Sequence, residues 1–516
     1  MKPLPQLPIG RQYFAKIRQD NDLYIDKTKY IYEICSKRNS AYFLSRPRRF
    51  GKSLTVDTID ELFSGNKALF EGLWITDKWD WTTKYPVIRL SLDVIGDKAG
   101  LAAALNKALR KIATKFKVKL TEDSPGQLFQ ELIQKVAEKR KKEVIILIDE
   151  YDRPIVDYID PFDYRKALEH RDILKEFFSI LKDNSHSIRF LLITGITKFA
   201  RVSIFSSLNH LIDLTLHPQA VALCGYTQAE LESYFQPYLE TMPPNTLELL
   251  KHWYNGYSWD GKTFLYNPFS ILNFFSTGVY ESYWFLTGTP TFLVKLLCQR
   301  FEYQLEEKEV SGFLLDTFVL EAQDKLDLDS LLLQTGFLTI KEIIQPTPWD
   351  ERYFVVKYPN EEVRQAFNRF LLSEYTHTQV SALHHVELLR ALAKNEIPRV
   401  IQKLNHLIQS IPDQNYIKNE EKFFQAIIHL IFTMIGTDVR YELHTPMGRA
   451  DTVVITKEHI FIFEFKINES ADDALQQIED KRYADALRHR NLPIVGIGVS
   501  FQTAQKGISD HRIRLL

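Results

Sequence analysis

The chain is poor in cysteine and has no excess of charge of either sign. Its 516 residues include three cysteines, Cys35, Cys224 and Cys298, which stand far apart without a Cys-x-x-Cys pair. This spacing excludes a disulfide framework and a cysteine-based zinc site, and it favours a reducing, cytoplasmic location. The 65 Lys and Arg residues are balanced by 66 Asp and Glu residues, for a formal net charge of −1. Any contact with nucleic acid therefore has to come from local basic patches, because no global positive field is available.

Long hydrophobic runs and a secretory leader are also lacking. The N-terminal sequence MKPLPQLPIGRQYF has neither the apolar core nor the small-residue cleavage site of a signal peptide. The uncharged, apolar-rich stretches 264–280 and 423–437 are shorter than the ~20 apolar residues that span a bilayer. The sequence therefore predicts neither export nor contact with a membrane.

The order of apolar segments predicts three domains. Residues 1–215 alternate strand-like runs with amphipathic helices, which is typical of a mostly parallel α/β sheet. Residues 216–410 are rich in aromatics and mostly helical, with strand candidates at 336–340 and 353–358, and no motif assigns a reaction to them. Residues 411–516 begin with a new amphipathic helix and continue with four strands and a further helix, which predicts a separate α/β module.

A phosphate-binding pattern follows the first predicted strand. Residues 41–54 read AYFLSRPRRFGKSL, an apolar strand and a loop, and then Gly51, Lys52 and Ser53 begin a helix. Such a loop favours phosphate through its backbone amides, while the lysine reaches the β/γ oxygens and the serine hydroxyl can ligate Mg²⁺. The pattern is the second half of a P-loop, but Arg46 stands where the first glycine of G-x-x-x-x-G-K-S belongs. The alternative is a helix start with a surface lysine.

A second motif, EVIILIDEYD, strengthens the P-loop interpretation. Five apolar residues, 144–148, precede Asp149 and Glu150, as in a buried parallel strand whose acidic end lies where α/β sheets bind ligands. We expect Asp149 to hold Mg²⁺ through water and Glu150 to polarise the attacking water as general base. The alternative is a core strand that ends in solvated acids.

Other polar residues are candidates for the same site. Thr194, at the end of the strand 188–195, is expected either to sense the terminal phosphate or to cap the turn that follows. Arg46, Arg48 and Arg49 are candidates for contact with phosphate or nucleic acid, the alternative being a solvated loop. Together these residues predict ATP and Mg²⁺ as cofactors.

The C-terminal module carries a metal-binding pattern. Asp451, in GRAD, is followed thirteen residues later by Glu464, and Lys466 lies two positions further on. Residues two apart in a strand share a face, and a turn around 457–459 would bring Asp451 beside Glu464. Two carboxylates can hold Mg²⁺, and the lysine can orient the attacking water or stabilise phosphate charge. The alternative is a hairpin with a surface ion pair, although charges within an apolar strand need partners.

The chain resembles the bacterial AAA-ATPase-like family in the segments RPRRFGKSL, LIDEYDRPI, TGITKFARVSIFSSLNHLIDLTL, WYNGYSW and YNPFSILNFF. Members of that family carry a C-terminal PD-(D/E)XK nuclease superfamily domain and tolerate arginine at the position of Arg46. The resemblance implies an α/β protein with a P-loop NTPase parallel sheet, a mostly helical middle domain and a restriction-endonuclease-like α/β domain. It also extends to the broader STAND-like signal-transducing ATPases with RRxGKS-type loops.

The resemblance implies further residues of the nuclease-like site. Glu421 matches the helical acid that many PD-(D/E)XK nucleases add to the metal site, with the adjacent Glu420 as its alternative and Glu442 as a weaker substitute. Gln477 matches a polar position that these nucleases place near the active site. For Glu421 and Gln477 the alternative is an exposed helix face. The cations within 481–490 are candidates for phosphate contact, and a charged solvent face is the alternative.

These patterns support three classes of function. The first is an enzyme, an NTP-driven or NTP-gated nuclease with DNA as its expected substrate. The second is a regulatory NTPase switch whose nuclease-fold domain binds nucleic acid or partners without cutting. The third is a scaffold that uses the aromatic middle segment. A homo-oligomer is compatible with each.

Overall fold

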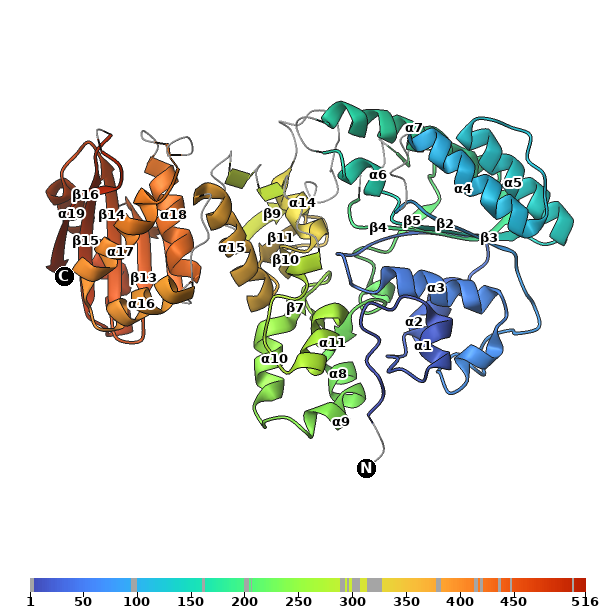
Figure 1. The fold of residues 1–516 in the computed structure, drawn as a ribbon, viewed down its shortest axis with the longest axis horizontal. Coiled ribbons are helices and arrows are strands. Elements are labelled where there is room, and N and C mark those ends of the chain that lie inside the picture. Colours follow the sequence, from blue (N-terminus) through green and yellow to red (C-terminus); the bar gives the residue numbers. More distant parts are fainter. Residues whose placement is uncertain are drawn as a thin grey trace. The chain divides into compact units, whose positions relative to one another are not determined.

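Contacts within the chain divide it into two compact units, Met1–Thr287 with Glu306–Val363, and Gly288–Leu305 with Arg364–Leu516. Figure 1 shows the fold of each unit. The computed structural model describes residues 4–516 except 94–99, 160–162, 199–203, 206, 288–292, 295–296, 299–306, 313–326, 377–381, 413–415, 418–420, 435–437, 446–447 and 504.

The first unit is built around a five-stranded sheet in which every neighbouring pair is parallel. In spatial order its strands are β2 (Val87–Ser91), β3 (Val144–Asp149), β4 (Ile188–Gly195), β1 (Ser40–Ser45) and β5 (Leu211–Asp213). All residues of β1, β3 and β4 are buried, which explains why these strands read as continuous apolar runs. Because the strands are parallel, their carboxyl ends meet at one edge, and β4 separates the strand before Lys52 from the strand that ends at Asp149.

Helices cover both faces of this sheet (Figure 1). One layer contains α4 (Leu101–Phe116), α5 (Pro125–Arg140) and α7 (Tyr164–Asp183), and the other contains α1 (Phe14–Gln19), α2 (Thr28–Cys35) and α3 (Lys52–Phe63). The start of α5 follows from its sequence, because Ser124 accepts a hydrogen bond from the amide of Gln127 and Pro125 occupies the first turn. The short α6 (Arg153–Val156) and the 3-10 helices η1 (Lys67–Phe70) and η2 (Ser185–Ser187) complete this part.

Residues after 215 add helices and two small antiparallel sheets to the same unit. The sheets have the strand orders β6-β8-β7 and β10-β11-β9. The strand predicted at 353–358 is β11, whereas the one predicted at 336–340 overlaps only the start of β10, its partner in an antiparallel hairpin. An aromatic core packs these helices against Leu23 and Ile25 of the N-terminal segment. The elements are η3 (Pro218–Ala220), β6 (Tyr226–Thr227), α8 (Gln228–Tyr234), α9 (Gln236–Leu239), α10 (Thr246–Tyr254), β7 (Asn255–Tyr257), β8 (Leu265–Tyr266), α11 (Pro268–Thr277), η4 (Phe285–Thr287), β9 (Lys308–Ser311), α14 (Leu328–Thr335), β10 (Thr339–Ile344) and β11 (Tyr353–Lys357).

The second unit contains a five-stranded mixed sheet, in which only β14 and β15 are parallel. Its strands, in spatial order, are β12 (Asp438–Thr445), β13 (Gly448–Ile455), β14 (Ile460–Ile467), β15 (Ile494–Phe501) and β16 (Ile508–Leu515). The four predicted strands are confirmed. The fifth, β16, was not predicted, because its pattern is mostly exposed and polar and gives no apolar run.

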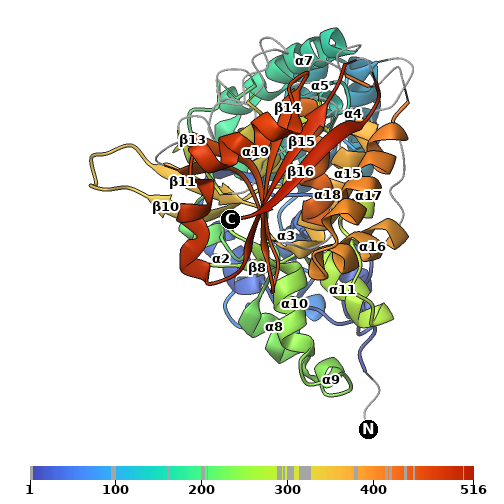
Figure 2. The ribbon, with the colours of Figure 1, turned by 90° about the vertical axis from the view of Figure 1, so that its left-hand side faces the viewer.

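Helices pack on both faces of the second sheet (Figure 2). On one face lies α19 (Ala471–Asp480), and on the other lie α18 (Glu421–Met434) and α17 (Ile397–Gln409). The helix predicted after β14 is α19. It ends at Asp480, because Arg482 adopts a left-handed conformation and the 3-10 helix η7 (Tyr483–Arg490) follows. The remaining helices are α15 (Glu361–Thr376) and α16 (Ala382–Ala393).

The predicted boundaries after residues 215 and 410 do not coincide with this division. Residues 216–287 and 306–363 belong to the same unit as the P-loop sheet, and helices α16 and α17 belong to the unit of the C-terminal sheet. The side-chain amide oxygen of Asn405 on α17 accepts a hydrogen bond from the amide of Ile508 on β16, at 2.7 Å. The middle segment is therefore divided between the two units, because its two parts bury their apolar faces on different sheets.

A fragment 364–516 is expected to unfold cooperatively, whereas a fragment 411–516 is expected to be much less stable. The shorter fragment lacks α17, whose buried side chains each contribute about 1.5–3 kcal/mol of burial, so its loss approaches the whole stability of a small domain. Thermal melts followed by circular dichroism test this expectation. Equal melting temperatures of the two fragments would contradict it. The buried side chains of α17 are Ile397, Val400, Ile401, Leu404, Leu407 and Ile408.

Candidate functional sites

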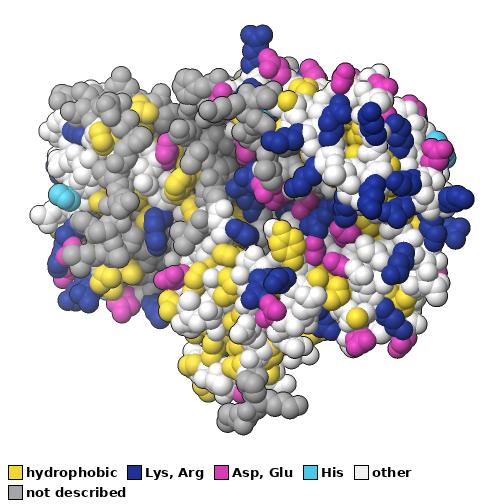
Figure 3. Space-filling model, turned by 45° about the vertical axis from the view of Figure 1, so that its right-hand side comes forward, with side chains coloured by type: hydrophobic (Ala, Val, Ile, Leu, Met, Phe, Trp, Pro, Cys, Tyr) yellow, Lys and Arg dark blue, Asp and Glu magenta, His cyan; other side chains and the backbone are white. Residues whose placement is uncertain are grey.

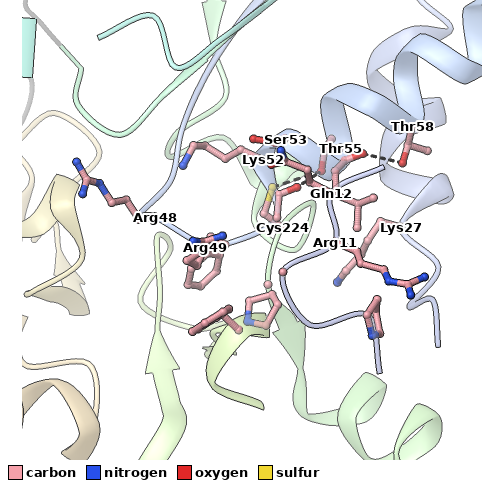
Figure 4. A pocket seen from close by; sticks show the side chains of 18 of the residues that line it. Arg11, Gln12, Lys27, Arg48, Arg49, Lys52, Ser53, Thr55, Thr58 and Cys224 are labelled. Atoms are coloured by element: carbon pink, nitrogen blue, oxygen red, sulfur yellow. Dashed lines mark hydrogen bonds between the residues drawn. The ribbon is translucent and has the colours of Figure 1, made fainter. Parts of the chain in front are cut away.

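The loop after β1 opens onto a cavity at the carboxyl edge of the parallel sheet. Gly51 adopts a left-handed conformation, with φ of 98°, and α3 begins at Lys52 without a side-chain cap on its N-terminus. Gly51, Lys52 and Ser53 line a cavity of about 460 Å³, together with Arg48 and Arg49 (Figure 4). The chain thus brings the amide groups of a helix N-terminus and several cations to one concave site, as phosphate binding requires.

The ammonium group of Lys52 lies inside the loop. It donates hydrogen bonds to the carbonyl oxygens of Arg46, at 2.8 Å, and Pro47, at 3.0 Å. Burial lowers the pKa of this ammonium group, and the carboxylates of Asp149 and Asp152 oppose that effect. The two hydrogen bonds therefore hold the lysine side chain at the place where a P-loop binds phosphate.

The acids after β3 lie at the same edge. The Asp149 carboxylate accepts hydrogen bonds from the Thr194 hydroxyl and from the amide of Glu150. Glu150 lines the cavity and adopts a left-handed backbone conformation with φ of 53°, which is uncommon for a residue with a side chain. Burial raises the pKa of the Glu150 carboxyl group. Thr194 is buried and does not line the cavity, so its hydroxyl orients Asp149 in this geometry.

Asp152 belongs to this site and was not singled out in the sequence. Its Oδ2 atom accepts hydrogen bonds from the amides of Ile196 and Thr197 and from the Thr197 hydroxyl. A Cβ atom at Gly195 would lie 2.6 Å from Asp152 and from the Tyr151 ring, so the close approach requires glycine. The loop after β4 is thereby held against the loop after β3.

Arg46 occupies a different place from the one that the sequence predicted. Its guanidinium group is fully buried and donates to the carbonyl oxygens of Ser45, Thr215 and Ala220, at 2.8 to 2.9 Å. The same group stacks on Trp259, with its central carbon 4.0 Å from the ring centre. Arg46 does not line the cavity, and both of its terminal amino groups, Nη1 and Nη2, donate hydrogen bonds within the protein. It supports the phosphate-binding loop from behind, where a glycine could supply no such contacts. Arg49 does line the cavity.

The aromatic motifs of the middle segment form a platform for the same loop. Phe50 packs edge-on against Tyr257 and Trp259, with ring centres 5.1 Å apart in each pair. The indole of Trp284 donates to the carbonyl oxygen of Arg48, at 3.0 Å. These contacts give the segments WYNGYSW and YESYWF a structural role that no sequence motif assigned to them.

Replacing Arg46 by glycine would restore the standard P-loop pattern but is expected to destabilise the protein by about 3–5 kcal/mol. The change removes three hydrogen bonds to carbonyl oxygens and opens a cavity beside Trp259. Denaturant unfolding measures the loss, and Arg38→Gly, at an exposed position, serves as the control. An unchanged stability combined with weaker ATP binding would instead place Arg46 on the nucleotide.

The C-terminal site lies between β13 and β14. The amide of Asp451 donates to Glu464 Oε2, at 3.4 Å, and the amide of Phe465 donates to Asp451 Oδ2, at 2.9 Å. Both carboxylates are buried, with 8% of Asp451 and 2% of Glu464 exposed. The predicted pairing of the two strands is thus confirmed, and it places the two acids side by side.

Three side chains complete the surroundings of Glu464. The ammonium group of Lys466 lies 3.9 Å from Glu464 Oε1, on the same face of β14. The side-chain amide of Gln477, on α19, donates to the same oxygen and also to the hydroxyl of Tyr483, at 3.4 Å. Tyr483 is buried and was not predicted. Its spacing from Gln477 in the sequence does not place the two residues on one face of a helix, so no pattern indicated the contact.

The start of α18 approaches Asp451. Glu421 is its first residue and accepts a hydrogen bond from Gln425, at 2.9 Å. Gln425 also hydrogen-bonds the Asp451 carboxylate, so it joins the helical acid to the metal-binding acid. Sequence analysis missed Gln425, although its position one helical turn after Glu421 could have indicated it. Of the alternatives, Glu420 and the side chain of Glu442 lie outside the described residues.

Comparisons with known proteins identify a family for each of the two regions that carry these residues. A family model described as "Predicted AAA-ATPase" matches residues 8–205, and a model of the PD-(D/E)XK nuclease superfamily matches residues 419–511. The chain is 38% identical, over 98% of each sequence, to a protein of Azotobacter chroococcum mcd 1 described as "Uncharacterized protein in vnfD 5'region". The chain belongs to the AAA-ATPase-like family. Its C-terminal domain belongs to the PD-(D/E)XK nuclease superfamily.

Membership of this family agrees with the predicted α/β fold, with a P-loop sheet and a nuclease-like C-terminal sheet. The matched ranges contain the residues proposed for each site, from Gly51 to Thr194 in the first and from Glu421 to Gln477 in the second. Among the helices that the structure describes, none is long and apolar enough to cross a membrane. The cations within 481–490 are mostly exposed, and their contact with phosphate stays a prediction.

The electrostatics of the nuclease-like site favour a divalent cation. Burial raises the pKa of both Asp451 and Glu464. The negative charge of Glu421 raises the pKa of Asp451 further, the charge of Asp451 raises that of Glu464, and Lys466 lowers both. Two adjacent buried carboxylates with one lysine leave negative charge that Mg²⁺ would neutralise, and Mg²⁺ commonly uses one or two protein carboxylates. Within the described part of the chain, no group of three or more His, Cys, Asp or Glu side chains is arranged to hold a metal. The donor set therefore fits a cation that keeps water and substrate oxygens as its other ligands.

Without metal, the protein is expected to lose stability as the pH rises from about 5 to about 8. A carboxyl group whose pKa is raised by folding binds its proton more tightly in the folded state, so stability is lost as the pH rises above the ordinary pKa. Mg²⁺ should raise the melting temperature, and more so at the higher pH. Glu464→Gln should remove most of both effects. Melting temperatures that do not depend on pH or Mg²⁺ would contradict this charge balance.

Proposed function

We propose that this protein binds and hydrolyses ATP in its first unit and uses this reaction to control Mg²⁺-dependent cleavage of nucleic acid, with DNA as the substrate, in its second. The observation that carries the proposal is the pair of buried carboxylates, Asp451 and Glu464, beside Lys466 on one sheet. Such a pair is costly for a protein to bury unless a cation uses it.

The nuclease-like residues have separate tasks. Asp451 and Glu464 would hold Mg²⁺, which when bound supplies an activated water and neutralises charge on the phosphate. Lys466 lies where it can stabilise the negative charge that develops on a phosphate oxygen. Gln477 holds Glu464 in place, and Gln425 does the same for Asp451.

The residues of the first unit match the requirements of a nucleotide triphosphate. Gly51 and Lys52 would bind phosphate, and Ser53 would hold the Mg²⁺ that accompanies ATP. Asp149 does not itself line the cavity, and its carboxylate, oriented by Thr194, would act on that Mg²⁺ through water. Glu150 lines the cavity and is available to orient the attacking water. Because hydrolysis needs little covalent chemistry from the protein, this positioning accounts for most of the expected catalysis.

A second candidate function is a STAND-like regulatory switch whose nuclease-fold domain binds nucleic acid or partners without cutting. It is favoured by the fact that Glu464 already accepts a hydrogen bond from Gln477, and by the lack of a third metal-binding acid within the described residues. The retained set of Asp451, Glu464 and Lys466 supports the cleaving enzyme instead.

A cleavage assay distinguishes the two functions. Plasmid DNA, single-stranded DNA and RNA are incubated with the full chain and Mg²⁺, with and without ATP, and EDTA provides the metal-free control. Metal-dependent cleavage that changes with ATP supports the proposal. Binding without cleavage under every nucleotide condition would establish the regulatory switch in its place.

A further inference from the structure

Positive charge is concentrated on the helical hairpin formed by α4 and α5. Residues 105–143 contain eleven Lys and Arg and five Asp and Glu, in a chain whose net charge is −1. None of these cations contributes to the two sites described above. Figure 3 shows many Lys and Arg side chains on the face of the first unit that carries these helices.

The cations project outward because the apolar faces of both helices are buried. Leu105 and Leu109 of α4, and Leu128 and Leu132 of α5, are fully buried. The exposed cations outnumber the acidic side chains that could pair with them. One pair is formed by Lys135 and Glu131, one helical turn apart. The following exposed residues form no ion pair with any residue that the structure describes: Lys111, Lys117, Lys119, Lys141 and Lys142.

Most of the cations of this hairpin lie at the C-terminal ends of the two helices. Lys139 donates to the carbonyl oxygen of Lys117, at 2.6 Å, and Lys135 donates to that of Lys119, at 2.8 Å. Lys115 and Arg140 both lie beside the ring of Phe116, within 6 Å of its centre at 5.9 and 5.8 Å. The C-terminal turns of α4 and α5 therefore present one continuous group of cations.

The same group borders a hollow. Lys141 and Lys142 line it together with His186 and Tyr85, and its volume is about 440 Å³. The ammonium group of Lys142 lies 5.5 Å from the centre of the Tyr85 ring. Cations around an aromatic ring suit a phosphate group with an attached sugar or base, because the ring offers a stacking surface beside the charge.

We infer that the C-terminal ends of α4 and α5, here called the basic surface, bind the phosphate backbone of a nucleic acid. The inference rests on the proposed function for the identity of the partner, which is the substrate of the second unit. A membrane is disfavoured, because interfacial helices insert exposed apolar side chains and no large hydrophobic side chain is exposed between residues 100 and 143. The many uncompensated lysines suit a polyanion, whose binding gains from the release of counterions.

Two of the lysines allow a test that spares the fold. Lys117 and Lys141, which end α4 and α5, both adopt the left-handed conformation, with φ of 56° and 52°. Glycine is favoured there, so Lys117→Gly with Lys141→Gly removes two charges while retaining or improving stability. The hydrogen bond from Lys139 uses a backbone oxygen and is kept.

Binding of the full chain to fluorescent duplex DNA is measured in EDTA over a range of salt concentrations. The double variant should lower the slope of log K against log salt by about 2 and weaken binding at least about tenfold at physiological salt. Lys251→Gln with Lys262→Gln is the matched control, because it removes two charges from exposed positions outside the basic surface. The control should bind as the parent does, and thermal melts should show both variants folded.

The outcomes separate this inference from the proposed function. Asp451→Ala tests the nuclease proposal through its effect on cleavage, whereas the salt dependence of binding in EDTA tests the basic surface. If the parent protein never cleaves nucleic acid, the nuclease proposal is refuted. If the Lys117→Gly, Lys141→Gly variant still binds more weakly than that parent, the basic surface is supported. Equal slopes for the double variant and its control overturn the inference. It is also overturned if duplex DNA, single-stranded DNA and RNA all fail to bind, whether or not anionic vesicles or an acidic protein bind instead.

Discussion

Lys466→Ala is expected to lower metal-dependent cleavage about 100- to 1,000-fold while leaving the fold intact. The ammonium group lies on the same face as Glu464, 3.9 Å from its carboxylate, and only 19% of its side chain is exposed. Removal of one preorganised positive group that stabilises developing charge typically costs this much. Single-turnover cleavage of a labelled DNA measures the chemical step, and Lys457→Ala, an exposed lysine in the β13–β14 turn, is the control.

The same cleavage assay also tests the two carboxylates. Asp451→Ala and Glu464→Ala should each abolish cleavage, and the double change should be little worse than either, because residues that act on one metal give non-additive effects. Glu421→Ala and Gln477→Ala should do less harm, since these side chains surround the pair. If Lys466→Ala cleaves as fast as the Lys457→Ala control, Lys466 has no part in catalysis.

Glu150→Gln is expected to slow ATP hydrolysis about 100- to 10,000-fold without weakening ATP binding. A general base typically contributes this factor, and glutamine keeps the shape of the side chain and the left-handed backbone of residue 150. Lys52→Ala should instead abolish binding, because the loop then lacks the cation that meets the phosphates. Calorimetry measures binding, phosphate release measures turnover, and Glu138→Gln, on the exposed face of α5, is the control.

Unchanged turnover in Glu150→Gln would assign the water-orienting task to another group, and Asp152 is then the first to examine. Asp152 lines the same cavity and holds the loop after β4 through three hydrogen bonds. ATP affinity that is unchanged in Lys52→Ala would contradict the P-loop interpretation itself. The two variants therefore test binding and chemistry separately.

The elements that carry the sites were predictable because their signals are local. A run of five apolar residues before Asp149 is typical of an inner parallel strand, which is buried on both faces. Side chains alternate between the two faces of a strand, so Glu464 and Lys466, two positions apart, share one face of β14 whichever strands lie beside it. By contrast, the short strand β5 and the exposed strand β16 have no apolar run, and they were missed because pairing with a neighbour forms them.

The partners of the site residues could not be predicted, because they come from distant parts of the chain. Arg46 looked like a phosphate ligand, yet its guanidinium group meets backbone oxygens about 170 positions away. Tyr483 reaches the nuclease-like site only because α19 ends at Asp480 and the chain turns back through Arg482. No periodicity in the sequence reports such contacts, since each depends on how separate elements pack.

By itself, the sequence determined which residue types stand at the ends of which strands, because the hydrophobic period and the motifs lie within a few residues of one another. This was enough for the α/β class, the phosphate loop around Lys52 and the acids at positions 451 and 464. Only the tertiary structure decided that the aromatic middle segment supports the phosphate loop and that α17 belongs with the C-terminal sheet. Both depend on which apolar faces meet, and many pairings of such faces bury similar areas until the whole chain is packed.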